Sequence, residues 1–75
     1  KPTPAAPADR PILTKRQLEC LKWVRTGESS WEIGRILNLS EHTVNEHLQA
    51  ARKRLGVRTT TQAVLEAAAR GLIEL

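Results

Sequence analysis

The stretch SSWEIGRILNLSEHTVNEHLQAARKRLG, from Ser29 to Gly56, decides the fold of this chain. Apolar residues recur every three or four positions on both sides of a break at residues 38–40, which indicates two helices joined by a tight turn. In the second helix they lie four, three and four positions apart and form one stripe: Val44, Leu48, Ala51 and Leu55.

The ends of these two helices are marked by their capping residues. Ser40 can accept a hydrogen bond from a first-turn N–H, and Gly56 can take the left-handed conformation that ends a helix. We therefore expect helices over residues 30–37 and 41–55, with Asn38 left-handed in the turn between them. The pair has the layout of a helix-turn-helix, which places its second helix in the major groove of DNA.

The polar face of the helix at 41–55 is suited to reading base edges. At ~100° per residue, Asn45, Glu46 and Gln49 lie opposite the apolar stripe. Asn and Gln amides can bond adenine through two hydrogen bonds, and Glu can accept one from the cytosine amino group. The alternative is a solvated face without a ligand, which is the commoner fate of polar residues.

Basic residues at the end of the same helix suit contacts to phosphate. Arg52, Lys53 and Arg58 lie in the stretch between Glu46 and Glu66, which contains no acidic residue. Such groups contact phosphates where a helix enters a groove. They can equally stabilise the negative end of the helix dipole, and both roles can hold at once.

Further phosphate contacts are expected near the start of the earlier helix. Ser29 and Ser30 lie at its N-terminus, where unpaired N–H groups attract anions. Trp31 either packs on the sugar–phosphate backbone or packs on the preceding helix or on a domain outside this chain. His47, on the later helix, is expected to bond a backbone group or a phosphate.

The remaining chain predicts one all-α domain behind a linker. Thr14 with Gln17, and Thr59 with Gln62, have capping-box spacing, which indicates helices starting at each threonine. Residues 1–11 hold all four prolines and no large apolar side chain, so an extended linker to an upstream domain is expected there. Residues 12–75 then form a single four-helix domain.

The last helix offers more apolar surface than one stripe requires. Its alanines widen the stripe, and Ala lets two helices approach closely. We expect pairing with a second copy through four residues: Val64, Leu65, Ala67 and Ala68. The alternative is that the alanines only favour helix formation.

Composition excludes several other classes. The net charge of +4 favours a polyanionic partner, nucleic acid before membrane, and no segment approaches the roughly 20 apolar residues of a membrane span. Cys20 is the one cysteine of the chain, so no internal disulfide is possible, which is typical of the cytoplasm.

His42 and His47 are ~140° apart on the helix, so one metal ion could not bind both. With no phosphate loop and no nucleophile–base pair, neither an enzyme nor a cofactor site is predicted.

Several short motifs occur together in the order of a known family. They are L-T-x-R at 13–16, W-V-x-x-G at 23–27, E-I-G-x-I-L at 32–37, S-E-x-T-V-x-x-H-L at 40–48 and R-K-x-L-G-V at 52–57. Together they resemble the DNA-binding domain of LuxR-type transcription regulators, also called the GerE-like domain. The resemblance implies a dimer on a palindromic site, with the third helix reading bases through Asn45, Glu46 and Gln49. Some members carry Arg or Lys at those positions, and this chain has none before Arg52.

The segment S-x-W-E-I-G at 29–34 is similar to the quorum-sensing branch of that family. Response regulators usually have a small or polar residue where Trp31 stands. The resemblance implies an absent N-terminal sensory domain that binds an acyl-homoserine lactone, a cytoplasmic location on the nucleoid, and RNA polymerase as a further partner. Two alternatives stay open: the output domain of a two-component response regulator, and a helical protein-interaction module whose basic patch meets an acidic partner.

Overall fold

Four helices make up the regular structure of this chain in a computed structural model, which describes residues 12–75. They are α1 (Lys15–Arg25), α2 (Ser30–Leu37), α3 (Glu41–Leu55) and α4 (Thr60–Ala69). No strand occurs within residues 12–75, so the predicted all-α class is confirmed. The linker predicted over residues 1–11 lies outside the described residues.

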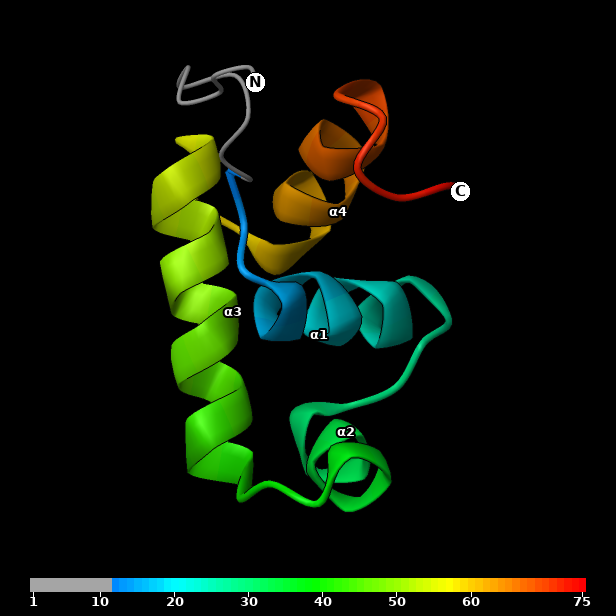
Figure 1. The fold of residues 1–75 in the computed structure, drawn as a ribbon, viewed down its shortest axis with the longest axis vertical. Coiled ribbons are helices and arrows are strands. Elements are labelled where there is room, and N and C mark those ends of the chain that lie inside the picture. The colour runs from blue at the N-terminus through cyan, green and yellow to red at the C-terminus, as the bar shows by residue number, and fades with distance from the viewer. Residues whose placement is uncertain (1–11) are drawn as a thin grey trace, which may run out of the picture.

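The longest helix, α3, runs the length of the domain, and the other three pack against it (Figure 1). α1 crosses α3 near its middle and lies between α2 and α4, which do not contact each other. α2 therefore lies beside the N-terminal half of α3, and α4 lies beside its C-terminal half. Within residues 12–75, this arrangement leaves one side of α3 uncovered along the helix.

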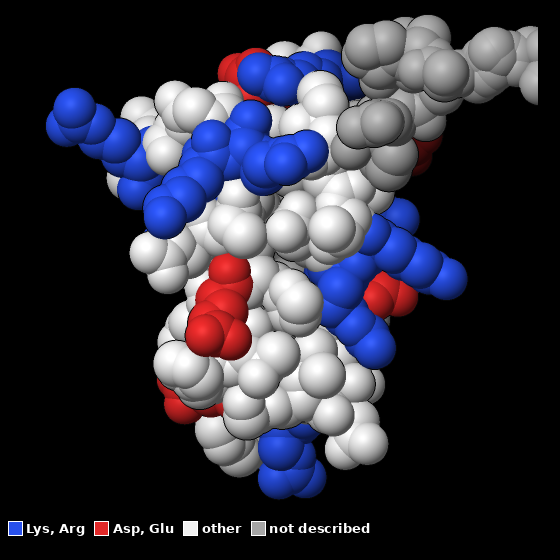
Figure 2. Space-filling view, turned by 60° about the vertical axis from the view of Figure 1, so that its left-hand side comes forward, with Lys and Arg blue, Asp and Glu red and all other residues white. Residues whose placement is uncertain are grey.

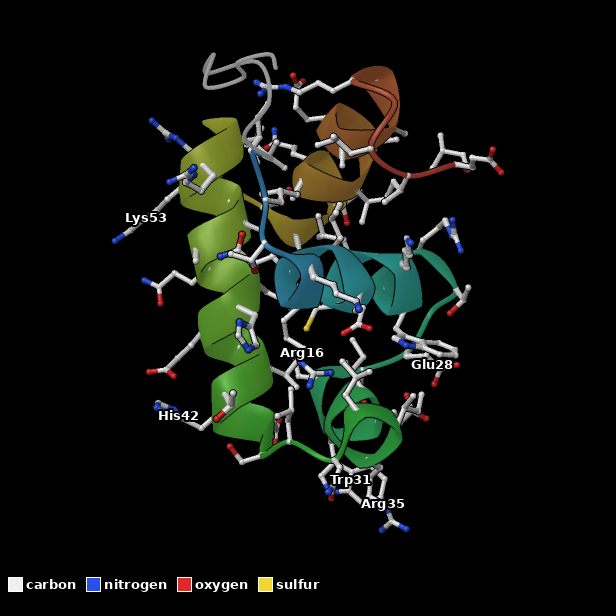
Figure 3. All side chains as sticks on the ribbon, in the orientation of Figure 1. Arg16, Glu28, Trp31, Arg35, His42 and Lys53 are labelled. Carbon is white, nitrogen blue, oxygen red and sulfur yellow. The ribbon has the colours of Figure 1, made fainter. Side chains whose placement is uncertain are left out.

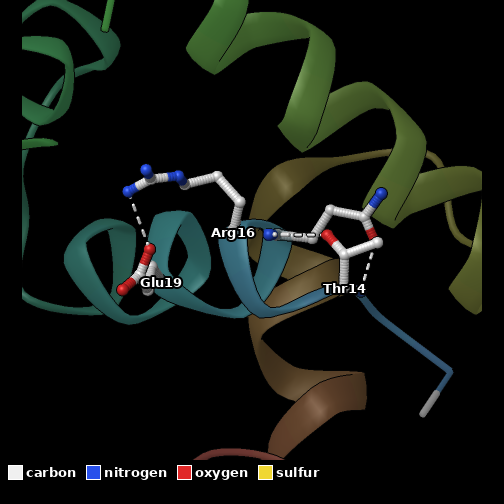
Figure 4. Close-up of polar contacts among 4 residues, drawn as sticks. Thr14, Arg16 and Glu19 are labelled. Carbon is white, nitrogen blue, oxygen red and sulfur yellow. Dashed lines mark hydrogen bonds and ion pairs between the residues drawn. The ribbon is translucent and has the colours of Figure 1, made fainter. Parts of the chain in front are cut away.

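Side-chain caps fix where the helices start. At α1 the Thr14 hydroxyl accepts from the Gln17 N–H at 3.1 Å, and the Gln17 side chain accepts from the Thr14 N–H at 2.9 Å (Figure 4). The same reciprocal pair joins Thr59 and Gln62 at α4, so both predicted capping boxes are confirmed. A third capping box starts α2. Each satisfies two backbone N–H groups that a helix leaves unpaired.

The turn between α2 and α3 is built on two backbone features. Asn38 has φ 61° and ψ 46°, the predicted left-handed conformation, which Asn adopts at lower cost than most residues. The Leu39 N–H then donates to the carbonyl of Gly34 at 2.7 Å. The turn therefore folds back over α2 and brings α3 close to it.

The core lies where α1, α2 and α4 meet α3. The predicted stripe of α3 is confirmed, because its four members are all buried: Val44, Leu48, Ala51 and Leu55. Cys20 on α1 is fully buried among these apolar side chains, and this burial raises the pKa of its thiol. The cysteine therefore packs as a small apolar residue.

The expectation that the alanines of α4 are surplus to the core is wrong for Ala63 and Ala67, whereas Ala69 is exposed. Ala63 and Ala67 are fully buried, and Val64 is only 7% exposed. Small side chains let α4 approach α1 and α3 closely, so these residues form its buried face. Leu65 lies on the other side of the helix and is 55% exposed.

Candidate nucleic-acid interface

The uncovered side of α3 carries the three residues predicted to read bases. Asn45, Glu46 and Gln49 are all exposed, so their predicted outward orientation is confirmed. His42 and Lys53 project from the same side of the helix (Figure 3). The polar side chains thus form a surface that runs along the helix and belongs to no part of the core.

The first of these side chains is held by the neighbouring helix. The hydroxyl of Ser30, the first residue of α2, lies 2.5 Å from Asn45 Oδ1 and donates to it. Ser30 is half-buried and lies 15 positions before Asn45 in the sequence. The structure therefore brings a predicted phosphate contact and a predicted base reader together.

The second base reader is paired along its own helix. His42 Nε2 lies 3.2 Å from Glu46 Oε2, and both side chains are largely exposed. An exposed i,i+4 pair of this kind stabilises a helix by only ~0.3–0.5 kcal/mol, so DNA can displace it. The side chain of Gln49 has no hydrogen-bond partner within residues 12–75. No cluster of metal-ligating side chains forms in this part of the chain either.

The N-terminus of α2 is occupied by its own cap. The Ser29 hydroxyl accepts from the Glu32 N–H at 3.2 Å, and the Ser29 N–H donates to the Glu32 carboxylate at 2.7 Å. The hydrogen bond that the Ser29 N–H donates to the carboxylate lowers the pKa of Glu32. Since the carboxylate is negative, it weakens the attraction of this helix end for a phosphate. The role predicted for Ser29 in phosphate binding stays a prediction.

Trp31 lies on the exposed side of α2, at the end of the domain. It is 55% exposed, and the guanidinium of Arg35 lies 5.1 Å from the centre of its ring (Figure 3). Trp31 is therefore not buried against α1 in this structure, and its packing on the DNA backbone or on another domain stays a prediction. Ile36 on the same helix is also 45% exposed, so α2 has exposed apolar side chains.

The three basic residues at 52, 53 and 58 that are predicted to contact phosphate divide into two kinds. Arg52 is half-buried and donates to the Thr60 hydroxyl at 3.0 Å, which ties α3 to α4. Lys53 and Arg58 are exposed. Figure 2 shows Lys and Arg atoms gathered at the end of this face where α3 terminates, above an acidic group nearer its middle. Lys53 and Arg58 are thus better placed for phosphate than Arg52.

The remaining predicted site residues differ in their exposure. His47 is half-buried on α3. Of the four residues predicted for dimerisation, Val64 and Ala67 lie in the core, Ala68 is half-buried and Leu65 is exposed. Only Leu65 and the edge of Ala68 are open to a partner in this conformation. The sequence did not indicate the Ser30–Asn45 and Arg52–Thr60 contacts, because each joins different helices.

Residues 11–67 match the model of a family described as bacterial regulatory proteins, luxR family. The chain belongs to this family. Its resemblance to the LuxR-type domain is therefore confirmed, and the chain is a helix-turn-helix DNA-binding domain of a transcription regulator. No helix within residues 12–75 has both the length and the apolar character that crossing a membrane requires.

Relatives of known name agree with that assignment. The chain is 44% identical over 64 residues to the transcriptional activator protein VanR of Vibrio anguillarum, covering 85% of this chain and 27% of VanR. It is 42% identical over 69 residues to the HTH-type quorum sensing-dependent transcriptional regulator RpaR of Rhodopseudomonas palustris, covering 92% of this chain and 28% of RpaR.

The fold also matches a solved structure. The transcription factor GerE superposes with a TM-score of 0.81 at 33% identity, covering 84% of this chain and 94% of GerE. The chain thus spans about a quarter of the length of VanR and RpaR but nearly all of GerE. The predicted four-helix architecture of this family is confirmed.

Proposed function

We propose that this domain recognises a specific duplex by placing α3 in the major groove. Asn45, Glu46 and Gln49 read base edges, and Lys53 and Arg58 bind phosphates on either side of the groove. The observation that carries the proposal is the uncovered face of α3, on which the base-reading residues and Lys53 are exposed and take no part in the core. A helix of this length needs one face for packing and has the other available for DNA.

The domain is further proposed to bind as a dimer to a palindromic site. Two copies related by a two-fold axis would place their α3 helices ~34 Å apart, one turn of DNA. The exposed side of α4 supports this arrangement, with Leu65 at its centre and Ala68 at its edge. Because this apolar surface is small, pairing would occur mainly on DNA, where each copy raises the local concentration of the other.

In the intact protein, an upstream sensory domain would control this binding. The name of RpaR, which describes quorum sensing-dependent regulation, supports a signal of the acyl-homoserine-lactone type. The ligand would bind that upstream domain, and the regulator would act in the cytoplasm on nucleoid DNA. Since VanR is named a transcriptional activator, RNA polymerase is proposed as a further partner. A phosphorylated receiver domain upstream is the alternative.

Selection from a randomised duplex library tests the function of the 75-residue chain. Affinity for the selected duplex is then compared with affinity for a scrambled duplex by fluorescence anisotropy. Two or more mismatched base pairs should weaken binding at least ~100-fold, because each costs about 1–3 kcal/mol. Equal affinity for both duplexes would contradict sequence-specific recognition and would favour the protein-interaction alternative.

A further inference from the structure

Two adjacent serines at the start of α2 have different hydrogen-bond partners. Ser29 is the N-cap, and its hydroxyl and N–H are both paired with Glu32. Ser30 is the first helical residue and takes no part in that cap. Its hydroxyl reaches across to α3 and donates to Asn45 Oδ1 at 2.5 Å. Within residues 12–75 this is the one hydrogen bond between side chains of α2 and α3.

We infer that Ser30 is a specificity-determining residue, which acts by fixing the orientation of the Asn45 amide on the DNA-reading face. This inference rests on the proposed function, because it assumes that Asn45 reads a base. Ser30 is a positioning residue in this account and need not contact DNA itself.

The chemistry of the amide explains why its orientation matters. Adenine presents an acceptor, N7, beside a donor, the N6 amino group, whereas guanine presents two acceptors, N7 and O6. To bond adenine, an Asn must place Oδ1 opposite N6 and Nδ2 opposite N7. To bond guanine, it must instead present hydrogens of Nδ2. An amide that rotates freely can satisfy either base in turn, so it discriminates poorly between them.

The Ser30 hydroxyl limits that freedom. In the structure it donates to Oδ1, which holds the oxygen end of the Asn45 amide on the side of α2. With the amide turned over, the hydroxyl would have to accept from Nδ2, and its own hydrogen would lose this acceptor. A carbonyl oxygen has two lone pairs, so Oδ1 can accept from Ser30 and from adenine N6 together, while Nδ2 stays available to donate to N7. The fixed amide also loses less side-chain freedom when DNA binds. Ser30 therefore favours adenine over guanine at the base that Asn45 reads.

The same hydrogen bond competes with a direct role for the Ser30 hydroxyl at phosphate. A hydroxyl has one hydrogen, and in this structure that hydrogen is given to Asn45. A phosphate oxygen only accepts hydrogen bonds, so it could bind this hydroxyl only if the hydrogen left Asn45 Oδ1. A phosphate contact and the observed donation to Oδ1 are thus mutually exclusive at Ser30, and an experiment can separate them.

The experiment compares Ser30→Ala, Asn45→Ala and the double variant on duplexes that differ at one base pair. The base pair that is varied is the one at which the DNA site selected by Asn45→Ala differs from the DNA site selected by the parent protein. The quantity measured is the ratio of Kd for the guanine duplex to Kd for the adenine duplex. Ser30→Thr, which keeps the hydroxyl, and Ser29→Ala, which removes the neighbouring cap, serve as controls.

Ser30→Ala should lower this ratio about three- to tenfold, the worth of one neutral hydrogen bond. In the Asn45→Ala background the same change should alter the ratio by less than about twofold, because the two residues act as one unit. Ser30→Thr should restore the parent ratio, and Ser29→Ala should leave the ratio unchanged even though it destabilises α2.

Two results would overturn the inference, and they differ in what else they affect. If Ser30→Ala weakens binding to both duplexes equally, the hydroxyl contacts phosphate and does not position Asn45, while base reading by Asn45 stands. If Asn45→Ala selects the same site as the parent at every position, Asn45 reads no base. The proposed base-reading set then fails together with the role of Ser30.

Discussion

Gly34 on α2 faces the carbonyl oxygen of Leu39 so closely that no side chain fits between them. A Cβ placed on Gly34 would lie 2.5 Å from that oxygen, which belongs to the backbone of the turn. The Leu39 N–H meanwhile donates to the Gly34 carbonyl at 2.7 Å. The tight connection between α2 and α3 therefore depends on the absence of a side chain at this position.

Gly34→Ala should destabilise the domain, although the same change in an ordinary helix stabilises it by about 1 kcal/mol. The turn must move to relieve the contact, and overpacking of this kind costs about 1–3 kcal/mol. Urea unfolding measures the loss. Gly56→Asn is the control, because Gly56 has φ 73° with no atom near its missing Cβ, and Asn tolerates that conformation. A Gly34→Ala variant as stable as the parent would show that the turn adjusts freely.

Much of the fold follows from short-range sequence signals. The capping pairs Thr14–Gln17 and Thr59–Gln62 each span one helical turn, and the left-handed Asn38 is a property of a single residue. The stripe of α3 repeats with the helical period, so its burial and its polar opposite face were both predictable. Such signals are readable because the atoms that interact are close in the sequence.

Other features depend on how helices pack, which local spacing does not encode. Ala63 and Ala67 look like excess apolar surface in the sequence, yet they are the residues through which α4 packs on the core. Arg52 reads as a phosphate contact, yet it bonds Thr60 on the next helix. The Asn45 side chain likewise has a partner on α2 that only the crossing of two helices reveals.

Lys53 and Arg52 should respond differently to replacement by alanine. Lys53→Ala should lower the slope of log affinity against log salt concentration by about 1, since one fewer counterion is released, and should leave stability unchanged. Arg52→Ala should also destabilise the domain by about 1 kcal/mol, because it removes the bond to Thr60. Salt titrations and thermal unfolding of both variants measure these effects.

Lys22→Ala is the matched control for that pair, because Lys22 is exposed on α1 beside Trp23 and Thr26, away from the reading face. It should change neither the slope nor the stability. A slope lowered equally by Lys22→Ala and Lys53→Ala would mean that the domain responds only to net charge.

Leu65→Lys should abolish cooperative binding to two half-sites and leave binding to a single half-site nearly unchanged. Leu65 is 55% exposed, so the charge enters no core and stability should change by less than about 0.5 kcal/mol. Leu75→Lys is the control, because Leu75 is 77% exposed and lies outside α4. Cooperativity that survives Leu65→Lys would place the dimer contact elsewhere.

Glu32 should make stability depend on pH in the acid range. The Ser29 N–H lowers the pKa of this carboxylate below its ordinary 4.5. Because the pKa is lower in the folded state than in the unfolded state, the stabilisation is present above pH 4.5 and is lost as pH falls through the folded pKa. The comparison is with Glu32→Gln, which keeps an acceptor but does not titrate.

The Tm advantage of the parent over Glu32→Gln should therefore shrink between about pH 6 and about pH 3. A difference in Tm that stays constant over this range would mean that the carboxylate charge contributes nothing to the cap.

The central claim is that the uncovered face of α3 reads DNA bases, and Gln49 tests it most directly. The side chain of Gln49 is exposed and has no hydrogen-bond partner within residues 12–75, so replacing it breaks no contact of the domain. The measurement is the site selected from a randomised duplex library by the parent and by Gln49→Ala. The account predicts that preference relaxes at one base position in each half-site, at a cost of about 1–3 kcal/mol there, and is retained elsewhere. Identical selected sites for the two proteins would contradict it.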